Sequence, residues 1–222
     1  MAATPDDMGL RERKRQHTRQ ALISAAMRLF EEKGYEQTTV AQIAATAQVS
    51  TKTFFNYFTS KDEVLFPHLS GRIDAAVALI EQRRHDEHMA DVLIRAMQHM
   101  LADALTAEVD GGLAALRLPM ILSEPAVQAA TLHRYFLAEA QLAEALHRAY
   151  PAALDPPAAA AVIGSVMGAA LAAALVCLQQ GDSTEQLEAA VQRAIGIAVA
   201  GLRNLGQASR RTRMTRPQRR SR

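Results

Sequence analysis

Residues 50–58 read STKTFFNYF and place aromatic and polar side chains within one short segment. In a helix that turns by about 100° per residue, Phe54 and Phe58 share one stripe, whereas Lys52 and Asn56 point to the opposite side. An apolar stripe packs against neighbouring helices, and the polar face opposite is left for solvent or a partner. The spacing therefore predicts a helix with one buried face and one recognition face.

The residue types on the recognition face match the groups that duplex DNA presents. Lys52 can approach guanine edges or phosphate, and Asn56 can donate or accept at base edges or phosphate. Thr51 or Phe55 can contact the methyl group of thymine. A charged surface helix with every phenylalanine in the core explains the nonapeptide equally well when it is taken alone. The surrounding elements must decide between the two interpretations.

Further donors for phosphate oxygens lie on either side of this segment. Tyr57 and Lys61 follow it, and Thr39 stands at a helix N-terminus where free amides also point outward. The basic stretch RERKRQHTR at residues 11–19 can track the DNA backbone or enter a minor groove. The DNA-binding candidates are Arg13, Lys14, Arg15, Thr39, Ser50, Thr51, Lys52, Thr53, Phe55, Asn56, Tyr57 and Lys61.

Two helices are expected before this segment. Apolar residues at helical spacing predict a first helix over residues 11–33 and a short second helix over residues 40–47. Thr38 or Thr39 is the expected N-cap of the second. A tight turn at residues 48–49 then leads to the recognition segment. Two short helices joined by a tight turn form a helix-turn-helix, whose second helix lies in the major groove of DNA.

The helical pattern continues to the end of the chain. Ser50 is expected to cap the third helix, and a capping box of Ser60 and Glu63 predicts a fourth helix from Lys61. No alternating run is long enough for a strand, so the fold class is all-α. The later helices are expected at residues 61–85, 90–106, 112–122, 125–150, 157–180 and 184–205.

The segment AAMRLFEEKGYEQTTVAQIAATAQVSTKTFFNYFTSKDEVLF, within residues 11–66, resembles the DNA-binding domain of the TetR family of bacterial transcriptional regulators. The resemblance implies an N-terminal three-helix DNA-binding domain, a larger helical domain for ligand binding and dimerisation, and a homodimer on a roughly palindromic operator. It implies phosphate contacts by Thr39, Tyr57 and Lys61. The implied recognition positions are Thr51, Lys52, Phe55 and Asn56.

Two positions depart from many members of that family. Phe55 stands where tyrosine is common, and Lys52 stands where glycine is common. A hydroxyl that could reach a base is lost and a charge is gained, so the operator sequence of a relative does not transfer to this chain.

Charge divides the chain into three expected parts. Residues 1–66 form the DNA-binding domain with its N-terminal arm, and residues 67–206, with nine basic and fifteen acidic side chains, form the ligand-binding and dimerisation domain. Residues 207–222 hold seven arginines and no acidic residue, and we expect this tail to be disordered. A ligand-independent DNA-binding protein that uses the arginine tail is therefore the alternative function.

Residues 156–180 carry no charge and are long enough to span a bilayer. Alanine and glycine fill more than half of the most apolar stretch, and these residues gain little from lipid. Gly164 and Gly168 instead permit close helix packing. We therefore expect no membrane insertion but a buried dimer helix, which would form a four-helix bundle with the last helix and the partner's pair.

Methionines and aromatics in the larger domain are candidates for a flexible apolar pocket. The stretch RLPMILSEPAVQAATLHRYFLAEAQL resembles an actinobacterial branch of the TetR family in which some members sense fatty acyl thioesters. An acyl thioester or another lipophile is therefore the candidate effector. The ligand-binding candidates are Met97, Met100, Arg117, Met120, His133, Phe136 and Met167.

The sequence gives little support for metal binding or catalysis. His85 and His88 flank two acidic residues, but zinc would need further ligands, so no metal or cofactor is predicted. No nucleophile elbow, P-loop or dinucleotide fingerprint occurs, so an enzyme is not expected, although a helical enzyme acting on an acyl substrate stays as an alternative. A single cysteine and no secretory signal predict a cytoplasmic protein.

Overall fold

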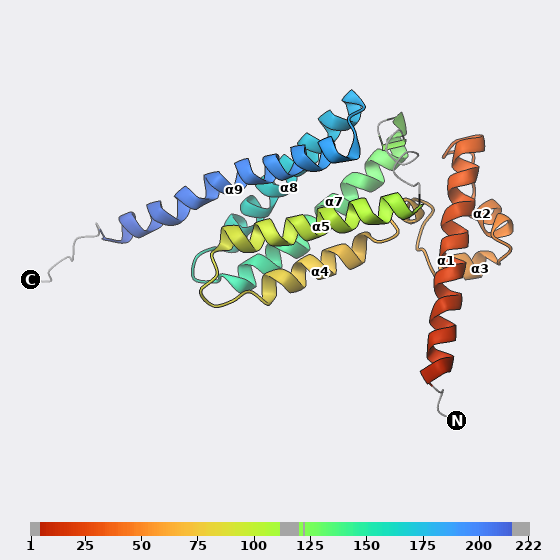
Figure 1. The fold of residues 1–222 in the computed structure, drawn as a ribbon, viewed down its shortest axis with the longest axis horizontal. Coiled ribbons are helices and arrows are strands. Elements are labelled where there is room, and N and C mark those ends of the chain that lie inside the picture. The colour runs from red at the N-terminus through yellow and green to blue at the C-terminus, as the bar shows by residue number, and fades with distance from the viewer. Residues whose placement is uncertain (1–4, 112–119, 122, 215–222) are drawn as a thin grey trace, which may run out of the picture. The chain divides into compact units, whose positions relative to one another are not determined.

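The structure is a computed structural model that describes residues 5–111, 120–121 and 123–214 (Figure 1). Every regular element in these ranges is helical, which confirms the all-α prediction. The elements are α1 (Pro5–Lys33), α2 (Val40–Thr46), α3 (Thr51–Phe55), the 3-10 helix η1 (Asp62–Leu65), α4 (Leu69–Glu81), α5 (Met89–Gly111), α7 (Pro125–Ala149), α8 (Pro156–Gln180) and α9 (Thr184–Met214).

The helices form two compact units. The first combines residues 1–69 with residues 108–132, and the second combines residues 70–107 with residues 133–222. The first unit therefore contains residues 108–132, which the sequence-based division placed in the larger domain. The end of α5 and the start of α7 belong to the same unit as the expected helix-turn-helix.

The core of the first unit lies between α1, α2, α3 and η1. Phe54 is 0% exposed and Phe58 1% exposed, so the apolar stripe of the recognition segment is buried as predicted. Val127, from the first turn of α7, is also 0% exposed and belongs to this core. The other buried members include Leu22, Ile23, Ala26, Phe30, Tyr35, Ile43, Val64 and Leu65.

The second unit is a helical bundle with its own core. Aliphatic residues from α4, α5, α7, α8 and α9 meet there, and α8 packs along α9 (Figure 1). The chain reverses between α8 and α9 at Gly181, whose φ of 72° is left-handed, a conformation that glycine adopts without strain. The fully buried members of the second unit's core include Ile80, Leu93, Leu142, Leu146, Ile163 and Val166.

Gly164 and Gly168 face α7 of the same chain. A Cβ atom at Gly164 would lie 2.7 Å from Oε1 of Glu139, and one at Gly168 would lie 3.8 Å from the Tyr135 hydroxyl oxygen. Close packing at these glycines therefore takes place within one subunit.

The predicted fourth helix is wrong in its first part. Residues 62–65 form a 3-10 helix and α4 begins only at Leu69. Proline disfavours helical backbone at the residue before it, and Phe66, before Pro67, has φ −127° and ψ 53°. Glu63 also accepts its cap bond from the Thr59 hydroxyl, at 2.7 Å, and not from Ser60.

The prediction of a disordered tail is wrong for residues 207–214, because α9 continues to Met214. Arginine, glutamine, alanine and methionine have good helix propensity, and no proline interrupts the chain before Pro217. Residues 215–222 lie outside the described residues, as do most of residues 112–122, where another helix was expected.

Candidate nucleic-acid interface

A complete capping box begins α2. Thr39 Oγ1 accepts a hydrogen bond of 3.2 Å from the Gln42 backbone N–H, and Gln42 Oε1 accepts one of 2.9 Å from the Thr39 N–H. The sequence allowed either Thr38 or Thr39 as the N-cap of α2, and the structure shows that it is Thr39. Thr38 is buried, and its hydroxyl donates to the carbonyls of Leu29 and Gly34. The two threonines therefore fix the path of the chain between α1 and α2.

The turn between α2 and α3 uses a left-handed residue. Gln48 has φ 56°, and the Val49 N–H donates to the Ala44 carbonyl at 2.9 Å. Ser50 then caps α3 by accepting a 3.0 Å bond from the Thr53 N–H. The Ser50 and Thr53 hydroxyls also share a hydrogen bond of 2.8 Å. These two candidate DNA ligands are therefore engaged with each other and shape the start of the helix.

The outer face of α3 is open. Thr51, Lys52 and Asn56 are exposed, and the Phe55 ring is 56% exposed although it is large and apolar. The structure thus brings the predicted base-contacting residues together on one surface, opposite the buried Phe54. The helix itself ends at Phe55, short of the expected residue 58.

Lys61 has a structural role that the sequence did not reveal. Its ammonium donates to the carbonyls of Tyr35, at 2.7 Å, and Thr38, at 3.0 Å, and lies 3.9 Å from the centre of the Tyr35 ring. Burial lowers the pKa of Lys61, and the carboxylates of Glu36, Asp62 and Glu124 oppose that shift. The predicted phosphate ligand therefore also ties η1 to the turn before α2.

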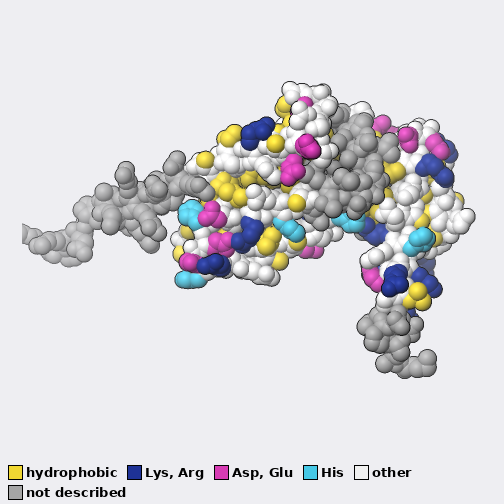
Figure 2. Space-filling view, viewed as in Figure 1, with side chains coloured by type: hydrophobic (Ala, Val, Ile, Leu, Met, Phe, Trp, Pro, Cys, Tyr) yellow, Lys and Arg dark blue, Asp and Glu magenta, His cyan; other side chains and the backbone are white. Residues whose placement is uncertain are grey.

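The basic stretch at the N-terminus is helical, since α1 begins at Pro5, where a proline suits the first helical turn. Arg13, Lys14 and Arg15 are exposed on α1, and Figure 2 shows basic side chains gathered on this part of the helix. Arg19 differs from them. Its guanidinium lies 5.1 Å from the centre of the Phe58 ring and donates to the Pro67 carbonyl, so it packs inside the first unit.

The ligand-binding candidates are not gathered around one cavity among the described residues. Met97 is buried in the second core, Met100 and Met167 pack against it, and Met120 packs against the first core instead. His133 is exposed and Phe136 is 58% exposed. Arg117 lies outside the described residues.

A cavity of about 620 Å³ lies between α8 and α9, and none of these candidates lines it. Alanines form half of its lining residues, with Cys177, Asp182 and Arg193 among the others. Burial and a hydrogen bond with Asp182 raise the pKa of the Cys177 thiol, which disfavours the thiolate form.

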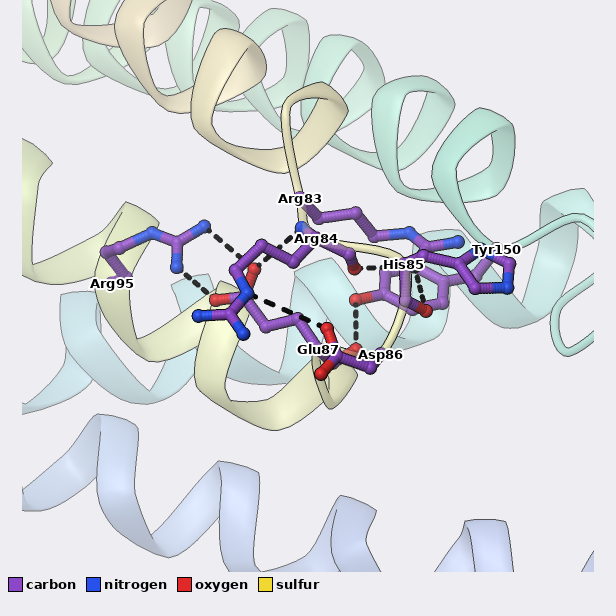
Figure 3. A network of polar contacts seen from close by, with 7 residues as sticks. All are labelled: Arg83, Arg84, His85, Asp86, Glu87, Arg95 and Tyr150. Atoms are coloured by element: carbon purple, nitrogen blue, oxygen red, sulfur yellow. Dashed lines mark hydrogen bonds and ion pairs between the residues drawn. The ribbon is translucent and has the colours of Figure 1, made fainter.

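Within the described ranges, no group of three or more His, Cys, Asp or Glu side chains could hold a metal ion, and His85 and His88 lie in the α4–α5 loop. The loop instead carries a polar network that sequence reasoning missed (Figure 3). Arg83 donates to the Ala149 carbonyl at 2.8 Å and stacks on Tyr150, whose hydroxyl donates to the Glu87 carbonyl at 3.2 Å. These bonds fasten the loop to the end of α7.

The apolar helix α8 is long and apolar enough to cross a membrane by length and composition. Only 28% of its most apolar window is buried within the chain. Leu171 is 36% exposed and Val176 is 50% exposed on α8, and Ile197 is 76% exposed on α9. The two helices thus leave an apolar surface that the described residues do not cover.

Comparison with known proteins finds a family model, related sequences and similar structures. Residues 22–66 match the family model of bacterial regulatory proteins, tetR family. The HTH-type transcriptional regulator TcmR of Streptomyces glaucescens is 38% identical over 119 residues, which cover 54% of this chain and 53% of that protein. The HTH-type transcriptional regulator HbdR of Aromatoleum sp. (strain CIB) is 48% identical over 56 residues, or 25% of this chain and 24% of that protein.

The chain therefore spans about half the length of TcmR and about a quarter of HbdR. A crystal structure described as a TetR-family transcriptional regulator from Mesorhizobium loti shares the fold, with a TM-score of 0.51 and 20% identity over 82% of this chain and 95% of that one. Residues 22–66 therefore match the family of bacterial regulatory proteins, tetR family, parts of the chain are similar to two transcriptional regulators, and the helical fold of the chain is shared with a solved structure.

Proposed function

We propose that the chain is a sequence-specific DNA-binding transcriptional regulator that acts as a homodimeric repressor. The observation that carries this proposal is the two-sided helix α3, in which Phe54 is fully buried while Lys52 and Phe55 are open to a partner. An exposed phenylalanine beside a lysine suits the major groove, where a thymine methyl and a guanine edge are within reach of such side chains. TcmR and HbdR, both described as transcriptional regulators, support the same class of function.

A second copy of the chain is the proposed partner in the dimer. Leu171, Val176 and Ile197 present apolar area on α8 and α9, and burial against a symmetric partner would remove this area from water. A twofold dimer places two copies of α3 on one duplex, which calls for a palindromic operator. A cytoplasmic location follows from this role.

The proposed effector is a small lipophilic molecule, with fatty acyl thioesters as the first compounds to test. Met97, Met100 and Met167, in and around the core of the second unit, support an apolar ligand, since methionine side chains adapt to variable shapes. Release of DNA requires that the ligand binds the released form more tightly than the DNA-bound form. The alternatives are a ligand-independent DNA-binding protein that uses the arginine tail and a helical enzyme acting on an acyl substrate.

The deciding experiment is a selection of bound fragments from random duplex DNA by the full-length protein, followed by titration of the recovered fragments with acyl thioesters. We expect a palindrome and a loss of affinity on adding the thioester. Equal affinity for random and selected DNA at physiological salt would contradict a specific regulator. Hydrolysis of the thioester in the same samples would favour the enzyme.

A further inference from the structure

Three residues in the described part of the chain have a left-handed backbone, and one of them is not a glycine. Gly34 follows α1 with φ 82°, Gly181 follows α8 with φ 72°, and Gln48 lies in the turn after α2 with φ 56°. A left-handed backbone brings the Cβ atom of an L-residue close to the following carbonyl oxygen, and glycine avoids this contact. Glutamine is therefore an unfavourable residue for this turn.

The hydrogen bonds at the end of α2 show that the turn is of a kind that favours glycine. The Val49 N–H donates to the Ala44 carbonyl at 2.9 Å, and the Gln48 N–H donates to the Ala45 carbonyl at 3.0 Å. This pair of bonds is the Schellman motif, whose left-handed position is usually glycine. The same two bonds, at 3.0 and 3.2 Å, close the end of α8 around Gly181. The two turns thus differ in the residue that occupies the left-handed position.

No contact with another described residue accounts for the glutamine. The Gln48 side chain is exposed and makes no hydrogen bond to another part of the described chain. Its backbone bonds would form equally well with glycine. A residue that keeps a strained backbone without a structural reason indicates a functional one.

The place of Gln48 in the fold indicates which function this is. It lies two residues before Ser50, the N-cap of α3. In a helix-turn-helix the N-terminal end of the second helix approaches the DNA. Glutamine side chains are among the donors that contact phosphate oxygens of a duplex. The Schellman bonds fix the backbone at Gln48 and therefore the direction in which its side chain leaves the turn.

We propose that Gln48 is a DNA-contacting residue whose side-chain amide donates a hydrogen bond to a phosphate oxygen of the operator. The DNA-binding candidates taken from the sequence do not include it. The inference rests on the proposed function, because the contact exists only if the chain binds duplex DNA. At this turn the protein gives up stability for affinity.

Thermal unfolding of the full-length protein tests the strain. Gln48→Gly should raise Tm by about 2–4 °C, and Gly181→Gln, the reverse exchange at the matching turn, should lower it by a similar amount. A Cβ atom at Gly181 would meet no atom within 4 Å, so this control adds strain without a steric clash. An unchanged or lowered Tm for Gln48→Gly would show that the turn is not strained and would overturn the proposal.

Fluorescence anisotropy with a selected operator and a scrambled duplex tests the contact. Gln48→Gly and Gln48→Ala should each weaken binding to both duplexes by about three- to tenfold, because both variants lack the amide. The dependence of affinity on salt should keep the wild-type slope, since an uncharged amide releases no counterion. Gln98→Ala, at an exposed position of α5, is the control and should bind as the wild type does.

A Gln48→Gly variant that is more stable yet binds DNA less well cannot owe its loss of affinity to misfolding. Wild-type affinity in both Gln48 variants would overturn the proposal. A loss confined to the operator would also overturn it, because the amide would then contact a base edge and not a phosphate. If the wild-type protein selects no duplex, the proposed regulator fails and the contact fails with it. If it selects a palindrome that both Gln48 variants bind equally well, the regulator stands and only the contact fails.

Discussion

Phe55 and Phe54 are neighbours in the sequence with opposite environments. The first ring is 56% exposed and the second is 0% exposed, and their centres lie 5.5 Å apart in an edge-to-face pair. Packing of Phe54 against the core therefore fixes the position of Phe55 on the surface. A rigid, exposed aromatic ring is a good recognition element because it loses little conformational freedom on binding.

Lys52→Ala and Asn56→Ala should each reduce discrimination between the selected operator and a scrambled duplex by about 1–3 kcal/mol, the range for a good side-chain contact to a base. Both residues are exposed, so the free energy of unfolding should change by no more than about 0.5 kcal/mol. Fluorescence anisotropy with both duplexes and urea denaturation measure the two quantities.

Lys33→Ala is the control for this pair, since it removes one exposed positive charge outside α3. This variant should lower the affinity for both duplexes by the same factor or leave both affinities unchanged. A loss of discrimination as large as that of Lys52→Ala, or intact discrimination in both α3 variants, would contradict the assignment of the recognition face.

The sequence predicted which side of α3 is buried, because the periodicity of a short helix depends only on neighbouring residues. It did not predict the second roles of Lys61 and Arg19. Their partners, the carbonyls of Tyr35, Thr38 and Pro67, are separated from them by 26, 23 and 48 positions. Contacts of this kind follow from the tertiary fold and leave no periodic signal.

The α4–α5 loop shows how one element is anchored by a few polar side chains. The Glu87 side chain is 13% exposed, accepts hydrogen bonds from Arg95 and also accepts one of 3.1 Å from the Arg84 backbone N–H. The Arg95 bond is the main reason that the pKa of Glu87 lies below its ordinary value of 4.5. The ionised carboxylate is thus preferred in the folded state.

Glu87→Gln should lower the free energy of unfolding at pH 7, and the difference from wild type should narrow in acid. Because the folded-state pKa is lowered, the stabilisation by Glu87 is fully present above pH 4.5 and is lost as pH falls through the folded-state value. Urea denaturation at pH 7, 4.5 and 3 checks this. If the free energies of unfolding of wild type and variant differed by the same amount at all three pH values, the charge of Glu87 would contribute nothing to stability.

The contact between α7 and α8 permits a test at its glycines. Gly168→Ala places a methyl group 3.8 Å from the Tyr135 hydroxyl oxygen, an ordinary contact distance, and alanine favours helix by about 1 kcal/mol over glycine. The variant should therefore be more stable by up to about 1 kcal/mol in thermal or urea unfolding. Gly71→Ala, where nothing lies within 4 Å, is the control for propensity alone. A destabilised Gly168→Ala with a stabilised Gly71→Ala would show that α8 requires the glycine for close packing.

Element boundaries were predictable where a local signal stops the helix and not elsewhere. Gly34 and Gly181 end α1 and α8 at the expected residues, both with left-handed backbone. Because of Pro67, α4 begins only at Leu69, although the capping pattern before it indicated a continuous helix. The end of α9 was expected at residue 205, where the apolar stripe stops, but helix propensity carries it to Met214. Apolar periodicity reports packing, so it misses a helix that extends beyond its core.

At the scale of the whole molecule, residues 108–132 join the first unit although they are remote in sequence from residues 1–69. The division predicted at residue 66 rests on local pattern and resemblance, neither of which reports which segments pack together. The second unit is different, because apolar residues on α8 and α9 stay exposed within one chain. This apolar surface is the feature that supports the proposed dimer.

Ile197→Glu should convert the proposed dimer into a monomer, because this side chain is 76% exposed in the single chain and a charge there would be buried without a partner in an α8–α9 interface. Light scattering should then give 24.1 kDa in place of twice that mass. Affinity for a full palindrome should fall by about 10² or more, the gain that two linked sites confer, while a single half-site should bind as before. Ile197→Val should keep the dimer, and Gln98→Glu, on the exposed side of α5, controls for added charge. A dimer that survives Ile197→Glu with its operator affinity intact would place the subunit contact on another surface.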